Sequence, residues 1–370
     1  MSSRADARDA GDGGGGADGV EGVIDMPWLV EPLRRTLVDQ RAHAVLLHGP
    51  GNVGQFELAL ALARGWLCES TEVAPGDRPC GRCASCRLNA ARSHPDLLVL
   101  VPDALRESLG WEQGADADEG GEGTGKRKPS KDIRVEAVRA AIAFATTTAA
   151  RGRGKFVVVH PAERMNEVAA SAFLKTLEEP PGDVRFLLCS AAPDRLLATI
   201  RSRCQQVTLP IPEKAEAEAW LARRGIAEPA VVLAAAGGQP QEAAARAASG
   251  LDAASWLALP RRIAAGDPLA FQGWPLPLAV EAMQKVCHDS LCLACGGEPR
   301  YFPRDCLTVG ASLAALLGWS RELARVAAEA EHPWTVDLAI ESLVEQGREA
   351  LKTPRSQQRD AKALSLNSRR

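Results

Sequence analysis

Residues 45–56 read Val-Leu-Leu-His-Gly-Pro-Gly-Asn-Val-Gly-Gln-Phe, and this stretch decides the fold. Its first three residues form a short apolar run that is typical of a buried strand, and a glycine-rich loop follows. Beyond the loop, apolar residues recur at the three- to four-residue spacing of one helix face, at Phe56, Leu60, Ala63 and Leu67. A strand, a glycine loop and a helix in this order predict a phosphate-binding loop. A glycine-rich turn unrelated to nucleotides is the alternative at this point.

The loop lacks the groups that ATP chemistry requires. A working loop has the pattern G-x-x-x-x-G-K-[ST], in which the lysine reaches the phosphates and the hydroxyl ligates Mg²⁺. Gly49 and Gly54 are present, but Gln55 and Phe56 replace the lysine and the hydroxyl residue. His160-Pro161 follows the third predicted strand, where an acidic pair is expected. These replacements predict a nucleotide-binding fold that hydrolyses no ATP. Weak phosphate binding by the loop amides remains open.

Short apolar runs alternate with helical patterns along the first 210 residues. We predict strands at 45–47, 97–101, 156–159, 186–189 and 207–209. Such alternation indicates an α/β domain with a parallel sheet covered on both faces. The strand pattern then stops. The expected organisation is a disordered leader at 1–22, the α/β domain at 23–210, a small helical module at 211–252, a helical domain at 253–350 and a polar tail at 351–370. Within the α/β domain, 103–131 are expected to be a flexible acidic insert.

Composition excludes several classes of protein. The net charge is −3, from 44 basic and 47 acidic residues, which argues against a dedicated DNA-coating protein. The sequence has no run of eighteen apolar residues, so we expect no transmembrane helix and no membrane partner. The N-terminus lacks the apolar segment of a secretory signal. We therefore expect a cytoplasmic protein whose ten cysteines are reduced.

Three of the cysteines form a compact cluster. Cys80, Cys83 and Cys86 have the spacing C-x₂-C-x₂-C, which suits one tetrahedral Zn²⁺. A closed structural site needs a fourth ligand, for which Cys68 and His94 are the candidates. Cys68 is preferred, because all-thiolate structural sites are common and His94 leads directly into a strand. Three unmetallated thiols are the alternative.

The other cysteines are expected to be structural. A second group lies near the C-terminus and comprises Cys287, Cys292, Cys295 and Cys306. Most of these fall on one predicted amphipathic helix, where cysteine acts as a small apolar residue, so we favour core packing over a second metal site. Cys189 and Cys204 are likewise expected to be buried beside the sheet.

Two further stretches carry a family resemblance. Residues 171–181 read Ser-Ala-Phe-Leu-Lys-Thr-Leu-Glu-Glu-Pro-Pro, and residues 196–204 read Leu-Leu-Ala-Thr-Ile-Arg-Ser-Arg-Cys. With the cysteine cluster, they resemble the delta-prime subunits of the bacterial DNA polymerase III clamp loader, which are AAA+ proteins. The resemblance is strong from about residue 28 to residue 209. It implies an AAA+ sheet domain of the P-loop type with a zinc knuckle at 68–86, followed by a helical lid and an all-helical collar.

The resemblance also implies roles for individual residues. Arg203, in the triplet with Ser202 and Cys204, matches an arginine finger that acts on the ATP of a neighbouring subunit. Gln55 and Phe56 match a loop that is already degenerate in this family. The zinc ligands of the family are matched by Cys68, Cys80, Cys83 and Cys86. Without the resemblance, a surface salt bridge is the simpler interpretation of Arg203. The helix end at Glu178 and Glu179 is interpreted as solvated.

The implied function is that of a non-hydrolysing stator in DNA replication. Such a subunit joins the gamma/tau motor subunits and the delta subunit in a hetero-pentamer, which loads the sliding clamp onto primer-template DNA. It has no catalysis of its own and belongs to the DNA-directed DNA polymerase holoenzyme as a component.

Two other functions remain open. An active ATPase with a divergent loop predicts Mg²⁺-dependent turnover by the isolated chain. A zinc-knuckle nucleic-acid-binding module predicts salt-sensitive DNA affinity that is lost when Cys83 is replaced.

Overall fold

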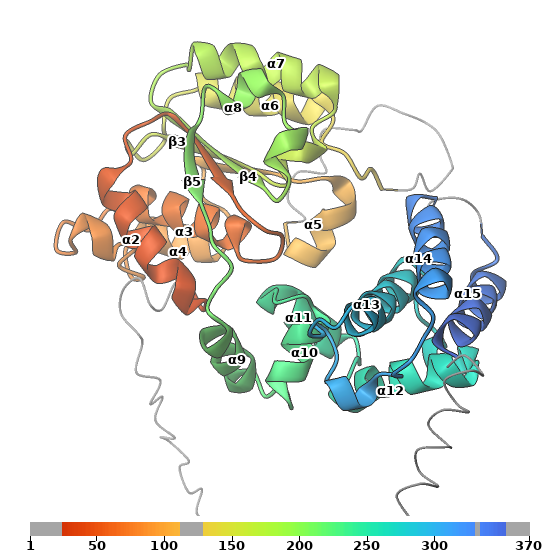
Figure 1. The fold of residues 1–370 in the computed structure, drawn as a ribbon. Coiled ribbons are helices and arrows are strands. Elements are labelled where there is room, and N and C mark those ends of the chain that lie inside the picture. Colours follow the sequence, from red (N-terminus) through yellow and green to blue (C-terminus); the bar gives the residue numbers. More distant parts are fainter. Residues whose placement is uncertain (1–23, 112–128, 330–333, 353–370) are drawn as a thin grey trace, which may run out of the picture. The chain divides into compact units, whose positions relative to one another are not determined.

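A computed structural model of the chain describes residues 24–111, 129–329 and 334–352. The predicted leader lies outside the described residues, as do most of the predicted tail and residues 112–128 of the predicted insert. The chain divides into two compact units between Pro212 and Glu213. Figure 1 shows both units, and each is described by itself.

The first unit is built on one parallel sheet. Its strands are β1 (Ala44–His48), β2 (Leu97–Leu100), β3 (Lys155–Val159), β4 (Val184–Ser190) and β5 (Gln205–Thr208). The strand order is β2-β3-β4-β1-β5, and every neighbouring pair is parallel. In the register of the sheet, Val45 of β1 pairs with Leu187 on one side and with Gln205 on the other. The predicted α/β class with a parallel sheet is confirmed.

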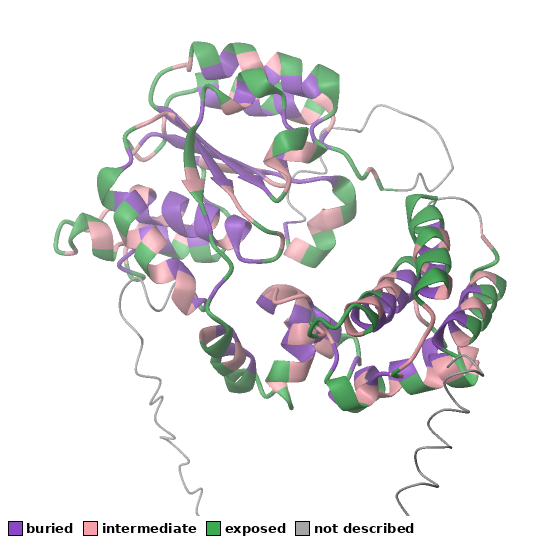
Figure 2. Ribbon diagram, in the orientation of Figure 1, coloured by how far each residue is buried: buried purple, intermediate pink, exposed green. Residues whose placement is uncertain are grey.

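Helices cover both faces of this sheet, with α2 and α3 on one face and α6 and α7 on the other (Figure 1). The central strands are therefore almost continuously apolar and buried, as Figure 2 shows. The helices of the unit are α2 (Val30–Asp39), α3 (Gln55–Leu67), α4 (Ala84–Ala90), α5 (Asp103–Leu109), α6 (Val135–Thr146), α7 (Glu167–Glu178) and α8 (Ala198–Arg201). Short 3₁₀ turns are η1 (Pro27–Leu29), η2 (Pro75–Asp77), η4 (Ala162–Arg164) and η5 (Pro193–Arg195).

Aromatic contacts anchor a helix to each face. Phe186 of β4 meets Phe173 of α7 edge-on, with ring centroids 5.1 Å apart. Phe156 of β3 stacks on Trp66 of α3 at 5.7 Å. Because successive strand residues point to opposite faces, one sheet contributes to both layers of the core.

The second unit is helical throughout its described residues. It comprises α9 (Lys214–Arg223), α10 (Pro229–Ala235), α11 (Pro240–Ala248), α12 (Ala253–Ala265), η6 (Pro268–Phe271), α13 (Leu276–Ala294), η7 (Arg304–Cys306), α14 (Leu313–Ala328) and α15 (Val336–Leu351). Trp256, Trp319 and Met283 lie in its core, and Ala235 and Leu251 of the predicted lid belong to the same cluster. A division of this unit at residue 252 stays a prediction. No described helix is long and apolar enough to cross a membrane.

The start of the predicted flexible insert is a helix, so this part of the prediction was wrong. Asp103 begins α5 and forms an ion pair with Arg106, 3.2 Å away, one turn later. A carboxylate in the first turn also complements the helix dipole. Gly110 ends the helix in the left-handed conformation at φ 64°, and Trp111 beyond it is buried. The acidic composition concealed these helix start and stop signals.

Candidate functional site

The glycine loop connects the carboxyl end of β1 to α3. Ligands of open α/β folds bind at the carboxyl ends of the strands. The shape of the loop is fixed by neighbours that precede β1. The Trp28 indole donates a hydrogen bond to the Val53 carbonyl at 2.9 Å. Gly54 has a φ of 103°, and a Cβ there would lie 2.5 Å from Leu29 Cδ1. Position 54 therefore requires glycine.

Gln55 turns its amide back onto the loop. Its side chain is buried, and Nε2 donates to the carbonyls of Pro50 at 2.6 Å and Gly49 at 3.2 Å. These bonds hold the loop closed on itself without a cation. A loop that binds the β/γ-phosphates places a lysine ammonium here.

Phe56 stacks on His160, with centroids 4.7 Å apart and an angle of 27° between the ring planes. Burial lowers the pKa of His160 from 6.5 to about 4, so the imidazole is neutral at pH 7. This ring pair stands where the Mg²⁺-binding hydroxyl and acidic residue are expected. Nearby, Glu163 accepts a hydrogen bond from the Ala191 amide, and the buried Ser190 hydroxyl accepts one from the Ala192 amide. The geometry thus shows two neutral rings at this position.

Arg203 lies at the amino ends of the strands, whereas the glycine loop lies at their carboxyl ends. It precedes β5, whereas the loop follows β1, and these strands are parallel with His48 opposite Thr208. The length of the strands alone separates Arg203 from the glycine loop by roughly 10 Å, at about 3.3 Å per residue.

The Arg203 guanidinium is exposed and bound to its own unit. Nη2 forms an ion pair with Glu178 Oε1 at 2.5 Å. Nη1 donates to the Thr199 carbonyl at 3.0 Å and to Ser202 Oγ at 3.4 Å. The interpretation of Glu178 as a merely solvated helix end missed this contact. The sequence did contain an indication of this contact, because a carboxylate at the C-terminus of a helix is unfavourable next to the negative end of the dipole unless a cation lies nearby.

The structure brings the four predicted zinc ligands together. Cys68 ends α3, Cys83 caps α4, and all four Sγ atoms lie within 4.8 Å of one another. The Sγ atoms of Cys80 and Cys86 are 3.9 Å apart. Tetrahedral Zn–S bonds of about 2.3 Å separate two sulfurs by about 3.8 Å, so the cluster fits such an ion.

Backbone amides support this cluster electrostatically. The amides of Cys80, Cys83 and Cys86 donate to the sulfurs of Cys68, Cys80 and Cys83, respectively. Burial opposes ionisation of Cys80, yet the amides of Cys83 and Arg82 bring its pKa down to about 6. His94 is engaged elsewhere, because its ring nitrogens bond Ser85 Oγ at 2.7 Å and the Asp96 amide at 3.1 Å. The buried four-cysteine cluster can bind a metal ion.

The second group of cysteines does not pack as predicted. Cys287 is buried, but Cys292 and Cys306 are half-buried and Cys295 is exposed. The prediction of core packing was therefore wrong for three of the four, because Cys292 lies near the end of α13, Cys295 caps that helix and Cys306 lies in the 3₁₀ turn η7. Cys189 and Cys204 are both buried, as predicted.

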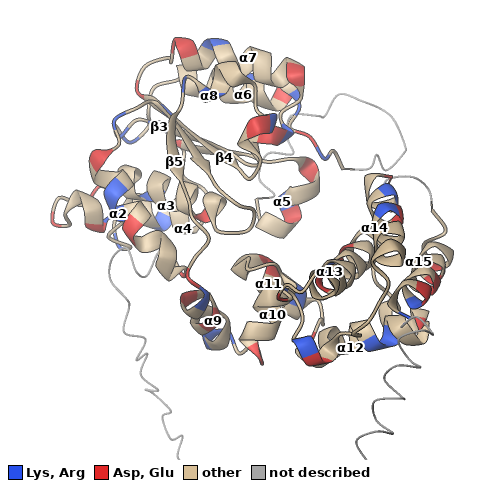
Figure 3. Ribbon diagram, in the orientation of Figure 1, with Lys and Arg blue, Asp and Glu red and all other residues tan. Residues whose placement is uncertain are grey.

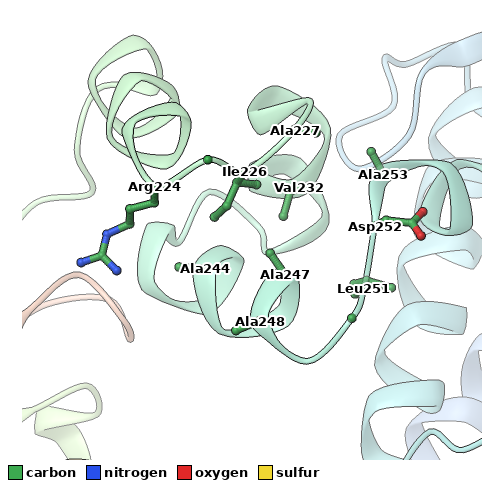
Figure 4. Close-up of a pocket in the computed structure, with 12 residues that line it drawn as sticks. Arg224, Ile226, Ala227, Val232, Ala244, Ala247, Ala248, Leu251, Asp252 and Ala253 are labelled. Carbon is green, nitrogen blue, oxygen red and sulfur yellow. The ribbon is translucent and has the colours of Figure 1, made fainter.

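A pocket of about 470 Å³ lies among α9, α10, α11 and the start of α12 (Figure 4). Alanine is the commonest residue in its wall, and Arg224 and Asp252 are its charged residues. Arg224 lies over the Trp220 ring at 4.2 Å, and Asp252 caps α12 by accepting from the Ser255 amide at 2.6 Å. Both charged groups thus serve the fold, and the pocket offers no catalytic pair.

Acidic and basic residues are intermixed along the described helices, as Figure 3 shows.

Comparison with known proteins identifies relatives of the first unit. Residues 28–213, which make up half of the chain, match the family described as "DNA polymerase III, delta subunit". DNA polymerase III subunit delta' of Pseudomonas aeruginosa is 41% identical over 205 residues, which cover 54% of each chain. Its namesake in Escherichia coli is 33% identical over 201 residues, covering 53% of this chain and 52% of that one. The chain spans about half the length of the curated relatives it matches.

Among solved structures, a DNA polymerase III gamma subunit-related protein from Thermotoga maritima is similar at a TM-score of 0.47 and 17% identity. That match covers 87% of this chain and 99% of the other, and a likeness at this level carries no weight for function. The family match and the relatives' names agree. The chain belongs to the family described as DNA polymerase III, delta subunit, and the relatives that it matches are named subunit delta'.

Proposed function

We propose that this chain is a non-hydrolysing stator of the clamp loader that donates Arg203 to the ATP site of a neighbouring subunit. The observation that carries this proposal is that Arg203 lies at the amino ends of the strands, whereas the glycine loop of the same chain lies at their carboxyl ends. Ser202 joins Arg203 in this role as the residue that holds Nη1. The partners are the gamma/tau motor subunits and the delta subunit in a cytoplasmic hetero-pentamer, and the complex acts on the sliding clamp and primer-template DNA.

The chemistry of the glycine loop supports the division of labour. Gln55 supplies no charge to a phosphate, and Phe56 and His160 supply no Mg²⁺ ligand in their stacked arrangement. A guanidinium is suited to the task of a finger, because its planar fork stays charged and matches phosphate oxygens. Fingers supplied in trans raise phosphoryl-transfer rates by roughly 10³ to 10⁵ in GTPases. The ATP that Arg203 serves therefore belongs to another chain.

The test is ATP turnover in the reconstituted clamp loader with DNA and clamp. Arg203→Ala is expected to lower turnover at the neighbouring site by about tenfold or more, because the charge that develops in transfer is left unstabilised. Arg203→Lys is expected to restore only part of it, since lysine lacks the fork. Arg201→Ala is the matched control, because it removes the same charge two residues away from Arg203. The Arg201 guanidinium forms its ion pair with Asp194. Full turnover with Arg203→Ala removes this residue from the mechanism, and Mg²⁺-dependent turnover by the isolated chain contradicts the stator role.

We further propose that Cys68, Cys80, Cys83 and Cys86 hold a structural Zn²⁺. Four thiolates close the coordination sphere, so the ion would tie α3 to α4 and supply no catalysis. Metal analysis of the chain purified without added metal is expected to find about one tightly bound zinc, absent from Cys83→Ser. A metal-free chain that unfolds at the same temperature as the native one would refute the assignment.

A further inference from the structure

The C-terminal part of α13 carries an imidazole and a thiol, and a second thiol caps the helix. His288 and Cys292 are four residues apart, which places them on the same face of the helix, and the C-cap residue Cys295 follows three residues later. The His288 side chain is half exposed, Cys292 is half-buried and Cys295 is exposed. All three lie outside residues 28–213, so the family match assigns them nothing.

His288 is oriented by a buried carboxylate. Its Nδ1 donates to Oδ1 of Asp289 at 2.9 Å, and Asp289 is completely buried. The Asp289 carboxylate also accepts the backbone amides of Arg300 at 2.9 Å, Tyr301 at 2.7 Å and Phe302 at 2.9 Å. These bonds fix Oδ1 and Oδ2 in place, so Asp289 serves as a hydrogen-bonding support and not as a ligand. With its proton on Nδ1, the ring presents the Nε2 lone pair for coordination.

The distance between Nε2 and the nearest thiol suits a shared ion. Cys292 Sγ lies 3.9 Å from His288 Nε2. A tetrahedral Zn²⁺ with bonds of about 2.0 Å to nitrogen and 2.3 Å to sulfur separates these two atoms by about 3.5 Å. Sγ is 3.8 Å from Nδ1 as well, so it lies beside the ring and not on the Nε2 axis. The half-buried Cys292 side chain has to rotate to bring its thiol into line. The exposed Cys295 side chain has to turn toward the site as well, because the ligand atoms within 4.8 Å of one another are those of His288, Asp289 and Cys292.

We propose that Nε2 of His288 and the thiolates of Cys292 and Cys295 form a second metal site, with Asp289 as the residue that orients the imidazole. Imidazole with two thiolates selects a borderline or soft ion such as Zn²⁺. A carboxylate bound to the second nitrogen of a ligating histidine is a recurrent support in metal sites. Three protein ligands leave one coordination position for water or for a group from another molecule. The site is independent of Arg203 and of the cysteine knuckle.

The test is the zinc content of the full-length reduced chain after equilibrium dialysis against buffered zinc. The native chain is expected to bind about two zinc ions, and Cys292→Ser and His288→Gln about one. Cys83→Ser is expected to bind one as well, and Cys83→Ser with Cys292→Ser none. Cys306→Ser is the matched control, because it removes another half-buried thiol of the same unit and should leave two.

Titration with Co²⁺ after the knuckle is loaded with zinc measures the second site alone. Thiolate-to-cobalt absorption is expected for the native chain, with affinity at least about tenfold weaker in His288→Gln, since loss of a mere supporting group already costs 10- to 100-fold. Because His288 and Cys292 are partly exposed, both variants should keep the native unfolding temperature. A single zinc in the native chain, or a second zinc that survives both substitutions, would overturn the proposal.

Discussion

Arg203 and Glu178 form an ion pair, with Nη2 of the guanidinium 2.5 Å from Oε1 of the carboxylate. Glu178 is the last residue of α7, where the negative end of the helix dipole adds to its charge. The guanidinium is thus held against its own unit by Glu178 and by the Thr199 carbonyl. An arginine that serves a neighbouring ATP has to leave these partners first.

We therefore expect Glu178→Gln to raise the basal ATP turnover of the reconstituted clamp loader. An exposed ion pair is worth up to about 1 kcal/mol, which corresponds to a rise of roughly two- to fivefold. Glu179→Gln is the matched control, because it removes the same charge from the next residue. A fall in turnover with Glu178→Gln would mean that the carboxylate orients the finger and does not restrain it.

The glycine loop can be tested by restoring its missing groups. Gln55→Lys combined with Phe56→Thr is expected to strengthen ATP binding by about 10- to 100-fold, because a charged hydrogen bond contributes about 1.5–3 kcal/mol. Hydrolysis should stay absent, since His160-Pro161 still replaces the acidic pair. A fluorescent nucleotide titration and a turnover assay measure the two effects. Gln55→Met with Phe56→Val is the control without cation or hydroxyl, and turnover by the first double variant would contradict this account.

The half-buried His160 predicts a pH dependence of stability. Burial lowers its pKa from 6.5 to about 4, so between these values the unfolded chain binds a proton that the folded chain refuses. Stability is therefore lost as the pH falls through this window, by up to about 3 kcal/mol at its lower end. His160→Phe keeps a ring against Phe56 and cannot titrate.

Urea unfolding of the native chain and of His160→Phe at pH 7 and pH 4.5 measures this difference. The two proteins share every other titrating group, including the cysteine cluster, so only the gap between their stabilities reports His160. The gap should widen in favour of the variant as the pH falls. If the free energies of unfolding of the two proteins change equally with pH, His160 takes up its proton in the folded state as readily as in the unfolded state.

A charge network ties α11 to α13 in the helical unit. The buried Arg246 contacts both oxygens of Glu281 at 2.7 Å, and Lys285 contacts Glu281 at 2.5 Å. Glu281→Gln is expected to lower the free energy of unfolding by about 2 kcal/mol, less than for a fully buried pair because Glu281 is partly exposed.

Glu242→Gln provides the comparison, because Glu242 meets Arg246 through a single contact to Nε at 2.7 Å. Urea denaturation should show a smaller loss for Glu242→Gln than for Glu281→Gln. Equal losses would mean that the second cation, Lys285, contributes nothing to the network.

Much of this molecule could be predicted from local pattern. The strand–loop–helix run around Gly49 and Gly54 was sufficient for the parallel sheet, because a glycine loop between a buried strand and an amphipathic helix permits few other folds. The spacing of Cys80, Cys83 and Cys86 was sufficient for their convergence, since residues three apart on a turn are neighbours. The replacements at Gln55 and Phe56 were visible directly.

Other features depended on contacts between residues that are distant in the sequence. Composition concealed α5, and the buried Trp111 that follows this helix lies beneath the Arg92 guanidinium. The helical pattern of α13 gave no indication that Asp289 would bind the amides of a following loop and so hold His288 beside Cys292. Periodicity describes one face of one helix, whereas these contacts join two segments.

The sequence by itself therefore determined the fold class, the convergence of the thiols and the loss of phosphate-binding groups, all of which are local properties of the chain. Only the tertiary structure decided what restrains Arg203. Glu178 ends α7 and Arg203 follows α8, and the folded domain brings their side chains into an ion pair. This contact joins two segments whose approach depends on packing within the domain, so no local pattern of the sequence predicts it.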